Sequence, residues 1–85
     1  MYEIYTSNKK VEKRLNNYID SYNNISDKLK RIKNNPRKEC DAHPLKGKLN
    51  GKWACWLGSN IRIIFVIDDY TKRIWIESIG THKIY

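Results

Sequence analysis

Polar and apolar positions alternate at the start of the chain, and their spacing then changes to that of a helix. Residues 2–6 alternate and are rich in aromatic and β-branched side chains, which predicts a short strand. Ser7 or Asn8 can cap a helix that follows. The apolar stripe of this helix comprises Val11, Leu15, Tyr18, Ile19 and Tyr22. The pattern predicts a strand followed by an amphipathic helix.

A second helix is predicted directly after the first. The Asn23–Asn24 pair interrupts the first stripe, and Ser26 offers a new N-cap. The second stripe comprises Ile25, Leu29 and Ile32. It ends before Pro36, because proline disfavours helical backbone at the residue that precedes it. Two helices in a hairpin are favoured over one long helix.

The second half of the chain has the pattern of strands and turns. Residues 36–51 contain both prolines and no regular period, which predicts a loop. Strand-like segments follow at residues 52–57, 62–67 and 73–79. The order of elements predicts an α+β fold in which two helices cover one face of an antiparallel sheet of about four strands.

Length and charge narrow the range of functions. The 85 residues leave room for a single domain, spanning residues 1–85. The formal net charge is +8, from 17 Lys and Arg against 9 Asp and Glu. A polyanion such as nucleic acid is therefore the first partner to consider. Many small proteins are basic for solubility alone, so the charge by itself decides little.

The sequence indicates no metal or cofactor site. Cys40 and Cys55 do not form a CxxC pair, and His43 and His82 lie far apart in the chain. There is no P-loop and no glycine-rich dinucleotide turn. Without a leader pattern or a long apolar run, we expect a soluble cytoplasmic protein with reduced thiols and no membrane association.

Arg62 is the most conspicuous polar residue, because it begins the most apolar strand-like segment. Its planar, permanently charged guanidinium matches a phosphate, and a stiff strand would hold it in place. The alternative is an arginine that reaches solvent or pairs with Asp68 or Glu77. Position along the chain does not separate these interpretations.

Two histidines could transfer protons near Arg62. His82 follows the last strand, whose end lies beside the start of the Arg62 strand if residues 68–72 form a hairpin turn. A histidine near its reference pKa of about 6.5 gives or takes a proton at neutral pH. The alternative is that His82 and His43 are ordinary surface histidines. Chain order does not place His43 relative to Arg62.

Two tryptophans sit on opposite faces of one predicted strand. Trp53 and Cys55 share one face, and Trp56 lies on the other. At most one of these tryptophans can face a core beneath the helices. The other is available to stack on a base or to contact a partner.

Three segments resemble the RelE/ParE superfamily of toxins from toxin–antitoxin systems. Residues 43–53, HPLKGKLNGKW, are similar to the family's PLxGxLxGxW pattern. Residues 60–69, NIRIIFVIDD, resemble its RIIYxID strand, and residues 79–85, IGTHKIY, resemble its closing GTH before a terminal aromatic. The earlier strand and helices follow the family's order. The resemblance implies a fold similar to that of microbial ribonucleases.

For the RelE, YoeB and YafQ branches, the resemblance implies cleavage of messenger RNA in the ribosomal A site. Arg62 matches the arginine that stabilises the phosphate, and His82 matches a catalytic histidine or arginine near the C-terminus. Tyr85 resembles the terminal aromatic that orients the substrate. His43 falls where YoeB-like members have a glutamate and YafQ-like members a histidine. We expect further RNA contacts from Lys46, Lys48, Lys52, Trp56 and Lys83.

The chain also departs from the family pattern. Trp53 and Cys55 replace strand lysines of RelE, and Trp56 stands where YafQ-like toxins have a second histidine. Asn60 stands where they have an aspartate, and Tyr85 comes one residue early. An inactive homologue that only binds an antitoxin is therefore one alternative.

The implied reaction needs a base, an acid and a cation, but no metal. The base takes the ribose 2′-OH proton, and the acid protonates the leaving 5′-oxygen. His43 and His82 can fill these roles in either order, with Arg62 as the cation. Expected partners are a RelB-like antitoxin, messenger RNA on the ribosome with ribosomal RNA contacts, and promoter DNA bound by the toxin–antitoxin complex. A ParE-like gyrase inhibitor is the other alternative, which the two histidines disfavour.

Overall fold

The computed structural model describes residues 1–58 and 60–81, which form five strands and two α-helices. The helices are α1 (Lys9–Ser21) and α2 (Ile25–Asn34). The strands are β1 (Glu3–Thr6), β2 (His43–Pro44), β3 (Trp53–Trp56), β4 (Arg62–Asp68) and β5 (Arg73–Gly80). Two 3₁₀ turns, η1 (Glu39–Asp41) and η2 (Gly47–Leu49), flank β2.

The strands form one mixed sheet in the order β1-β5-β4-β3-β2. Strands β2 to β5 pair antiparallel with their neighbours, whereas β1 runs parallel to β5. The predicted α+β class and three-stranded meander are confirmed. The sheet differs from the expectation in having a fifth strand and one parallel pair. A parallel pair needs a crossover connection, and here α1, α2 and the meander separate β1 from β5.

Strand β2 lies in the segment that was predicted to be a loop. It is only two residues long, with His43 opposite Ala54 and Pro44 opposite Trp53. Two residues are too few to show an alternating pattern. A proline is acceptable at the edge of a sheet, because its missing N–H would otherwise face solvent.

The two predicted helices are confirmed, and their caps differ. The Asn8 side chain accepts a hydrogen bond from the Val11 N–H at 2.9 Å, which satisfies one of the exposed donors at the start of α1. The prediction that Ser26 caps α2 is wrong. Helix α2 begins at Ile25 with Asn24 as its N-cap, so Ser26 lies inside the first turn.

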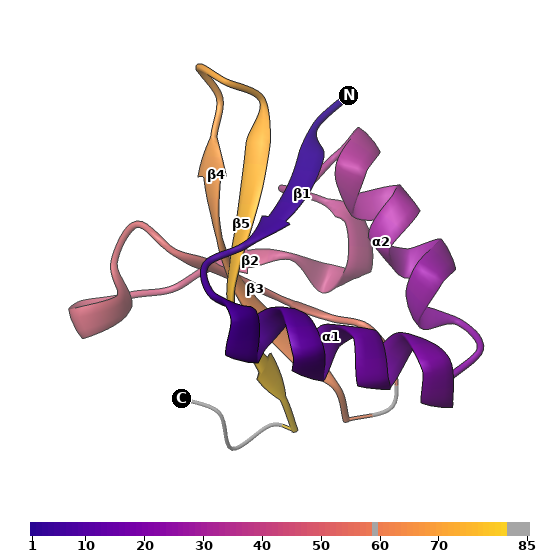
Figure 1. Cartoon of the computed structure of the whole chain (residues 1–85). Coiled ribbons are helices and arrows are strands. Elements are labelled where there is room, and N and C mark those ends of the chain that lie inside the picture. The colour runs from indigo at the N-terminus through magenta and orange to yellow at the C-terminus, as the bar shows by residue number, and fades with distance from the viewer. Residues whose placement is uncertain (59, 82–85) are drawn as a thin grey trace.

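One core lies between the helices and the sheet, and Figure 1 shows α1 and α2 on the same side of the strands. The helices contribute the predicted stripe residues Val11, Leu15, Ile25, Leu29 and Ile32. The strands contribute Cys55 of β3, Ile63 and Phe65 of β4, and Ile74, Ile76 and Ile79 of β5. Leu57 and Ile61, between β3 and β4, complete the core cluster. Neither helix is both long and apolar enough to cross a membrane.

Candidate functional site

The sheet face opposite the helices carries the polar residues singled out from the sequence. Directly opposed residues of neighbouring strands place their side chains on the same face. Trp56, Arg62 and Gly80 form one such row across β3, β4 and β5. None of the three belongs to the core cluster beneath the helices. We call the sheet face that carries this row the outer face.

Arg62 is held against Trp56 by the strand register. The guanidinium carbon lies 4.0 Å from the centroid of the Trp56 ring, and the Nε atom is buried. Gly80, opposite Arg62 on β5, has no side chain to crowd the arginine. The prediction that the end of the last strand lies beside the start of the Arg62 strand is confirmed.

The two carboxylates considered as partners for Arg62 are engaged elsewhere. Glu77 pairs with Lys52, with 2.5 Å between Oε1 and Nζ. Asp68 accepts hydrogen bonds from the backbone N–H groups of Tyr70 and Thr71. Hydrogen bonds from Thr71 hold the pKa of Asp68 below its usual range.

His43 belongs to a second row on the outer face. Its partner on β3 is Ala54, which in turn pairs with Ile64 on β4. The ring Nδ1 lies 3.0 Å from the carbonyl oxygen of Asp41. A carbonyl oxygen can only accept, so Nδ1 carries the hydrogen, and the lone pair of the neutral ring is then on Nε2. This contact favours the neutral tautomer that can act as a base at Nε2.

The backbone before His43 has an unusual conformation. Cys40 and Asp41 have φ of 59° and 57°, in the left-handed region. This region costs a non-glycine residue about 1 to 2 kcal/mol. The two residues turn the chain within η1, so that the Asp41 carbonyl faces the His43 ring.

His43 and Arg62 share the outer face on two strands that are not adjacent, β2 and β4. The register separates them by two strand spacings and one two-residue step, or about 12 Å between Cα atoms by standard sheet geometry. A substrate lying on the outer face could contact both side chains.

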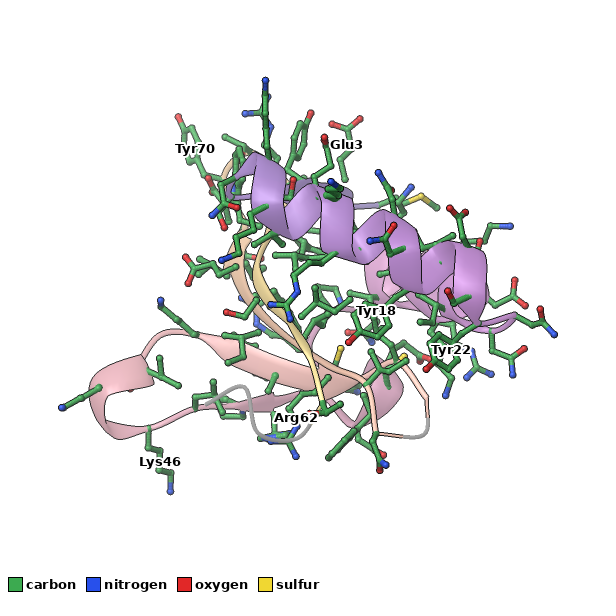
Figure 2. All side chains as sticks on the ribbon, turned by 60° about the horizontal axis from the view of Figure 1, so that its bottom comes forward. Glu3, Tyr18, Tyr22, Lys46, Arg62 and Tyr70 are labelled. Carbon is green, nitrogen blue, oxygen red and sulfur yellow. The ribbon has the colours of Figure 1, made fainter. Side chains whose placement is uncertain are left out.

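The predicted RNA-binding lysines differ in their surroundings. Lys46 and Lys48 are exposed on the loop around η2, and Figure 2 shows Lys46 and Arg62 projecting on the side of the sheet away from α1. Lys52 is half-buried, and its charge is neutralised by Glu77. His82, Lys83 and Tyr85 lie outside the described residues, so their roles stay predictions.

The two tryptophans separate as the alternation predicts. Trp53 packs against the core, with the Arg37 guanidinium carbon 5.7 Å from its ring centroid. Trp56 lies on the outer face beside Arg62. The tryptophan available for a ligand is therefore Trp56.

The cysteines take no part in this site. Both are free thiols, as predicted. Burial raises the pKa of Cys55, which is part of the core, far above its usual range, and it also raises the pKa of Cys40. Among the described residues, no three His, Cys, Asp or Glu side chains gather closely enough to hold a metal ion.

Sequence reasoning missed two contributors to the site. One is the Asp41 carbonyl that orients His43, for which the sequence contains no signal. The other is the ion pair of Glu77 with Lys52 in place of the considered pair with Arg62. Glu77 is the extra residue of a β-bulge, because Phe65 pairs with Ile76 and Ile64 with Ser78. The spacing of Ile76 and Ile79 could have revealed this bulge, because strict alternation cannot put both in the core.

Comparisons with known proteins agree on the fold. No family model matches the sequence, and no curated protein matches it significantly. Solved structures do match. A YoeB/ParE toxin from Agrobacterium tumefaciens has a TM-score of 0.75 at 14% identity, over 94% of this chain and 98% of that one.

Two further structures are similar over nearly their whole length. The YoeB-YefM toxin-antitoxin complex from Staphylococcus aureus, a heterotetramer, contains a chain with a TM-score of 0.73 at 20% identity, over 96% of this chain and 98% of that one. YafQ from E. coli has a TM-score of 0.69 at 20% identity, over 96% of this chain and 94% of that one. YoeB and YafQ are toxins of the RelE/ParE superfamily, so the chain has the RelE/ParE toxin fold.

Proposed function

We propose that this protein is the toxin of a type II toxin–antitoxin system and that it cuts messenger RNA on the ribosome. The observation that carries the proposal is Arg62, fixed against Trp56 on the same sheet face as His43. The structural similarity to YoeB and YafQ supports it, as does the net charge of +8. The similarity of one chain of the YoeB-YefM complex also supports an antitoxin partner.

In the proposed reaction, a base removes the proton from a ribose 2′-OH and the oxygen attacks the adjacent phosphorus. The bond to the 5′-oxygen breaks, and an acid protonates that oxygen. The products are a 2′,3′-cyclic phosphate and a 5′-hydroxyl end. His43 Nε2 is the proposed base, and the Arg62 guanidinium stabilises the charge that develops on the phosphate. His82 as the acid and Tyr85 as the orienting aromatic enter through the resemblance alone.

The ribosome would complete such a site by positioning the message. His43 and Arg62 stand about 12 Å apart by sheet geometry, so an RNA strand must lie across the outer face to meet both. Lys46 and Lys48, exposed beside this face, are suited to phosphate or ribosomal RNA contacts. Binding of the toxin–antitoxin complex to promoter DNA is a further expectation from the same resemblance.

The proposal is tested by in vitro translation of a defined message, with cuts mapped by primer extension. Wild type should cut within the reading frame only when ribosomes are present. Arg62→Ala should cut at least about 100-fold more slowly, the loss typical of removing a group that stabilises transition-state charge. Arg31→Ala is the matched control, because Arg31 is 63% exposed on α2 and loses the same charge.

Inhibition of translation without cuts would reject the nuclease proposal. Equal cutting by wild type and Arg62→Ala would leave the nuclease but remove Arg62 from the reaction. Gyrase inhibition without cuts would favour a ParE-like toxin instead.

A further inference from the structure

The outer face extends well beyond Arg62, toward the turn that joins β4 and β5. Val66 lies four residues after Arg62 on β4, so alternation puts both side chains on the same face, about 13 Å apart along the strand. Val66 pairs with Trp75 on β5, and Trp75 pairs with Tyr5 on β1. The outer face therefore carries a further row of side chains, formed by Val66, Trp75 and Tyr5.

Two aromatic rings of this row are in contact. The ring centroids of Tyr5 and Trp75 lie 5.0 Å apart, with 31° between the ring planes. The Arg73 guanidinium carbon lies 5.0 Å from the Tyr5 ring centroid. Neither aromatic residue belongs to the core beneath the helices, and Tyr5 is 38% exposed. We call Tyr5, Arg73 and Trp75 the aromatic cluster. Aromatic rings and guanidinium planes are the flat groups on which unpaired bases stack.

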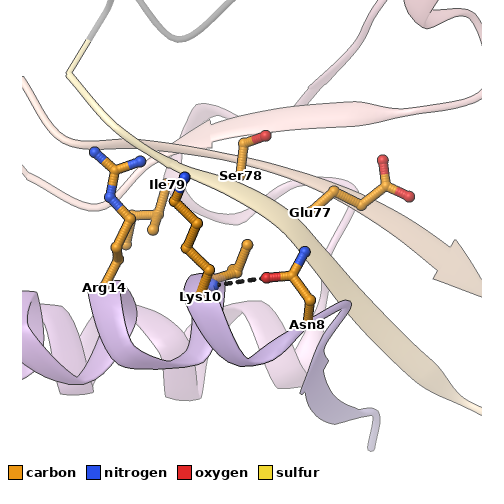
Figure 3. Close-up of a pocket in the computed structure, with 7 residues that line it drawn as sticks. Asn8, Lys10, Arg14, Glu77, Ser78 and Ile79 are labelled. Carbon is orange, nitrogen blue, oxygen red and sulfur yellow. Dashed lines mark hydrogen bonds between the residues drawn. The ribbon is translucent and has the colours of Figure 1, made fainter.

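The part of β5 between the aromatic cluster and the Arg62 row does not repel RNA. Figure 3 shows Ser78 pointing away from α1, whereas Ile79 points toward the helix. Glu77 is the one acidic residue of β5, and its ion pair with Lys52 neutralises it. An RNA strand can therefore pass from Arg62 to the cluster without meeting an uncompensated carboxylate of β5.

The far side of the aromatic cluster is acidic. Arg73 pairs with Glu3 on β1 and with Asp68 on β4. Figure 2 shows Glu3 far from Arg62, at the end of the molecule that carries Tyr70. Two carboxylates face one guanidinium, so this end is negative overall. It disfavours a phosphate or an acidic polypeptide segment, while the net charge of +8 disfavours a basic partner.

These charges and flat groups select an uncharged, flat occupant. A nucleobase has no net charge at neutral pH, and base–aromatic stacking tolerates any sequence because every base has a π-face. We propose that the aromatic cluster binds an unpaired base of the same RNA strand whose scissile phosphate lies at Arg62. This inference rests on the proposed function. It adds a contact remote from the reacting atoms, which would anchor the strand across the outer face.

The test measures binding of short, fluorescently labelled single-stranded RNA to the full chain by anisotropy, without ribosomes. The RNA carries 2′-O-methyl groups, so the proposed reaction cannot cut it. The Tyr5→Leu/Trp75→Leu variant should bind at least about 5-fold more weakly than wild type, the lower end of the contribution of one base–aromatic stack. The Tyr5→Phe/Trp75→Phe variant keeps both rings and should bind close to wild type.

A matched control removes two other exposed rings. The Tyr22→Leu/Tyr70→Leu variant changes residues that are 48% and 98% exposed, at the end of α1 and in the turn between β4 and β5. Neither residue belongs to a row of the outer face. This variant should bind RNA as wild type does.

A second probe separates stacking from charge. A strand of abasic nucleotides keeps the phosphates of the RNA and lacks its bases. Wild type and Tyr5→Leu/Trp75→Leu should bind this strand equally. With the base-containing RNA, the slope of log affinity against log salt concentration should be the same for both proteins, because the substitutions remove no charge.

Four results would overturn the inference. They are no binding of RNA by wild type, equal binding by wild type and the double leucine variant, equal weakening by the phenylalanine variant, and equal weakening on the abasic strand. A chain that cuts message but binds RNA independently of these rings would lose this inference alone. A chain that binds RNA through the rings without cutting message would lose the proposed nuclease.

Discussion

Arg62 and His43 are each held on the outer face by a contact with a neighbouring residue. The Arg62 guanidinium carbon lies over the Trp56 ring in a cation–π contact. The Asp41 carbonyl favours one neutral tautomer of His43. Both side chains are thus oriented before a substrate arrives, which lowers the cost of reaching the reactive geometry.

Replacing His43 tests its part as a base. His43→Ala should slow cleavage of ribosome-bound message by about 10²- to 10⁴-fold, the usual contribution of general acid–base catalysis. Asp41→Gly should cut close to the wild-type rate, because the main-chain carbonyl remains and glycine adopts a positive φ without strain. Single-turnover cleavage measures both variants. Wild-type speed in His43→Ala would remove this residue from the reaction.

The ion pair between Lys52 and Glu77 limits the positive charge of the outer face. Glu77→Gln should leave Lys52 without its carboxylate, so single-stranded RNA should bind more tightly. The slope of log affinity against log salt concentration should become steeper by the amount expected for about one more phosphate contact. Fluorescence anisotropy with a labelled oligonucleotide at several salt concentrations measures this. Glu12→Gln on α1 makes the same charge change at an exposed site. An equal gain in both variants would show that only net charge matters.

For single residues, the sequence predicts on which face of the sheet a side chain lies better than it predicts which residues that side chain contacts. Alternation along β3 separates Trp53 from Trp56, and the hairpin places Gly80 opposite Arg62. The contact between His43 and Asp41 depends on two left-handed residues, Cys40 and Asp41. Non-glycine residues rarely adopt that conformation, so no local pattern signals it.

Among the elements, the β4–β5 hairpin is tied to the segment that follows α2. Both Arg37 guanidinium Nη atoms donate to the Asp69 carboxylate, at 3.0 and 2.6 Å. The Tyr2 hydroxyl donates to the same carboxylate at 2.5 Å. Asp69 therefore joins the tip of the hairpin, the start of the chain and the connection after α2.

The hydrogen bonds to Asp69 make the stability of the fold depend on pH. The hydrogen bond from Arg37, with that from Tyr2, lowers the pKa of Asp69 to about 2. A lowered pKa stabilises the fold above the unfolded value of about 3.9, and this contribution is lost as pH falls from about 4 through about 2. Asp69→Asn should melt at a lower temperature than wild type at pH 7, and the difference should shrink toward pH 2. A constant difference in thermal unfolding across this range would contradict the assignment.

Helix α2 depends on a few fully buried side chains. Ile32 is 0% exposed, so Ile32→Ala should lower the free energy of unfolding by about 2 to 5 kcal/mol. A small domain has only about 5 to 15 kcal/mol in total, so the variant should be close to unfolding. Lys30→Ala, at an exposed position of the same helix, should change the free energy of unfolding by less than about 0.5 kcal/mol. Urea unfolding measures both, and equal losses would contradict the packing described.

Long, periodic elements are the part of the fold that the sequence predicts. The stripes of α1 and α2 and the alternation of β3 to β5 each bury one face, and this requirement leaves a pattern. Strand β2 leaves none, because it pairs only two residues. The parallel position of β1 depends on contacts between the two ends of the chain, which local spacing does not record.

For the whole molecule, the two faces of the sheet differ in what they carry. The helix side holds the core, and the outer face carries Arg62, Trp56 and His43. A chain of 85 residues buries limited surface, and a sheet covered on one face only leaves the other for chemistry. Its charge of +8 suits RNA, the proposed substrate.

The central claim is that the outer face cuts RNA through attack by the neighbouring 2′-OH. The most direct measurement uses a message in which one nucleotide, at a mapped cut site, carries 2′-deoxyribose. The account predicts that ribosome-dependent cutting disappears at this position and persists at other sites in the same message. Continued cutting at the deoxy position would mean that water is the nucleophile, and would contradict the roles given to His43 and Arg62.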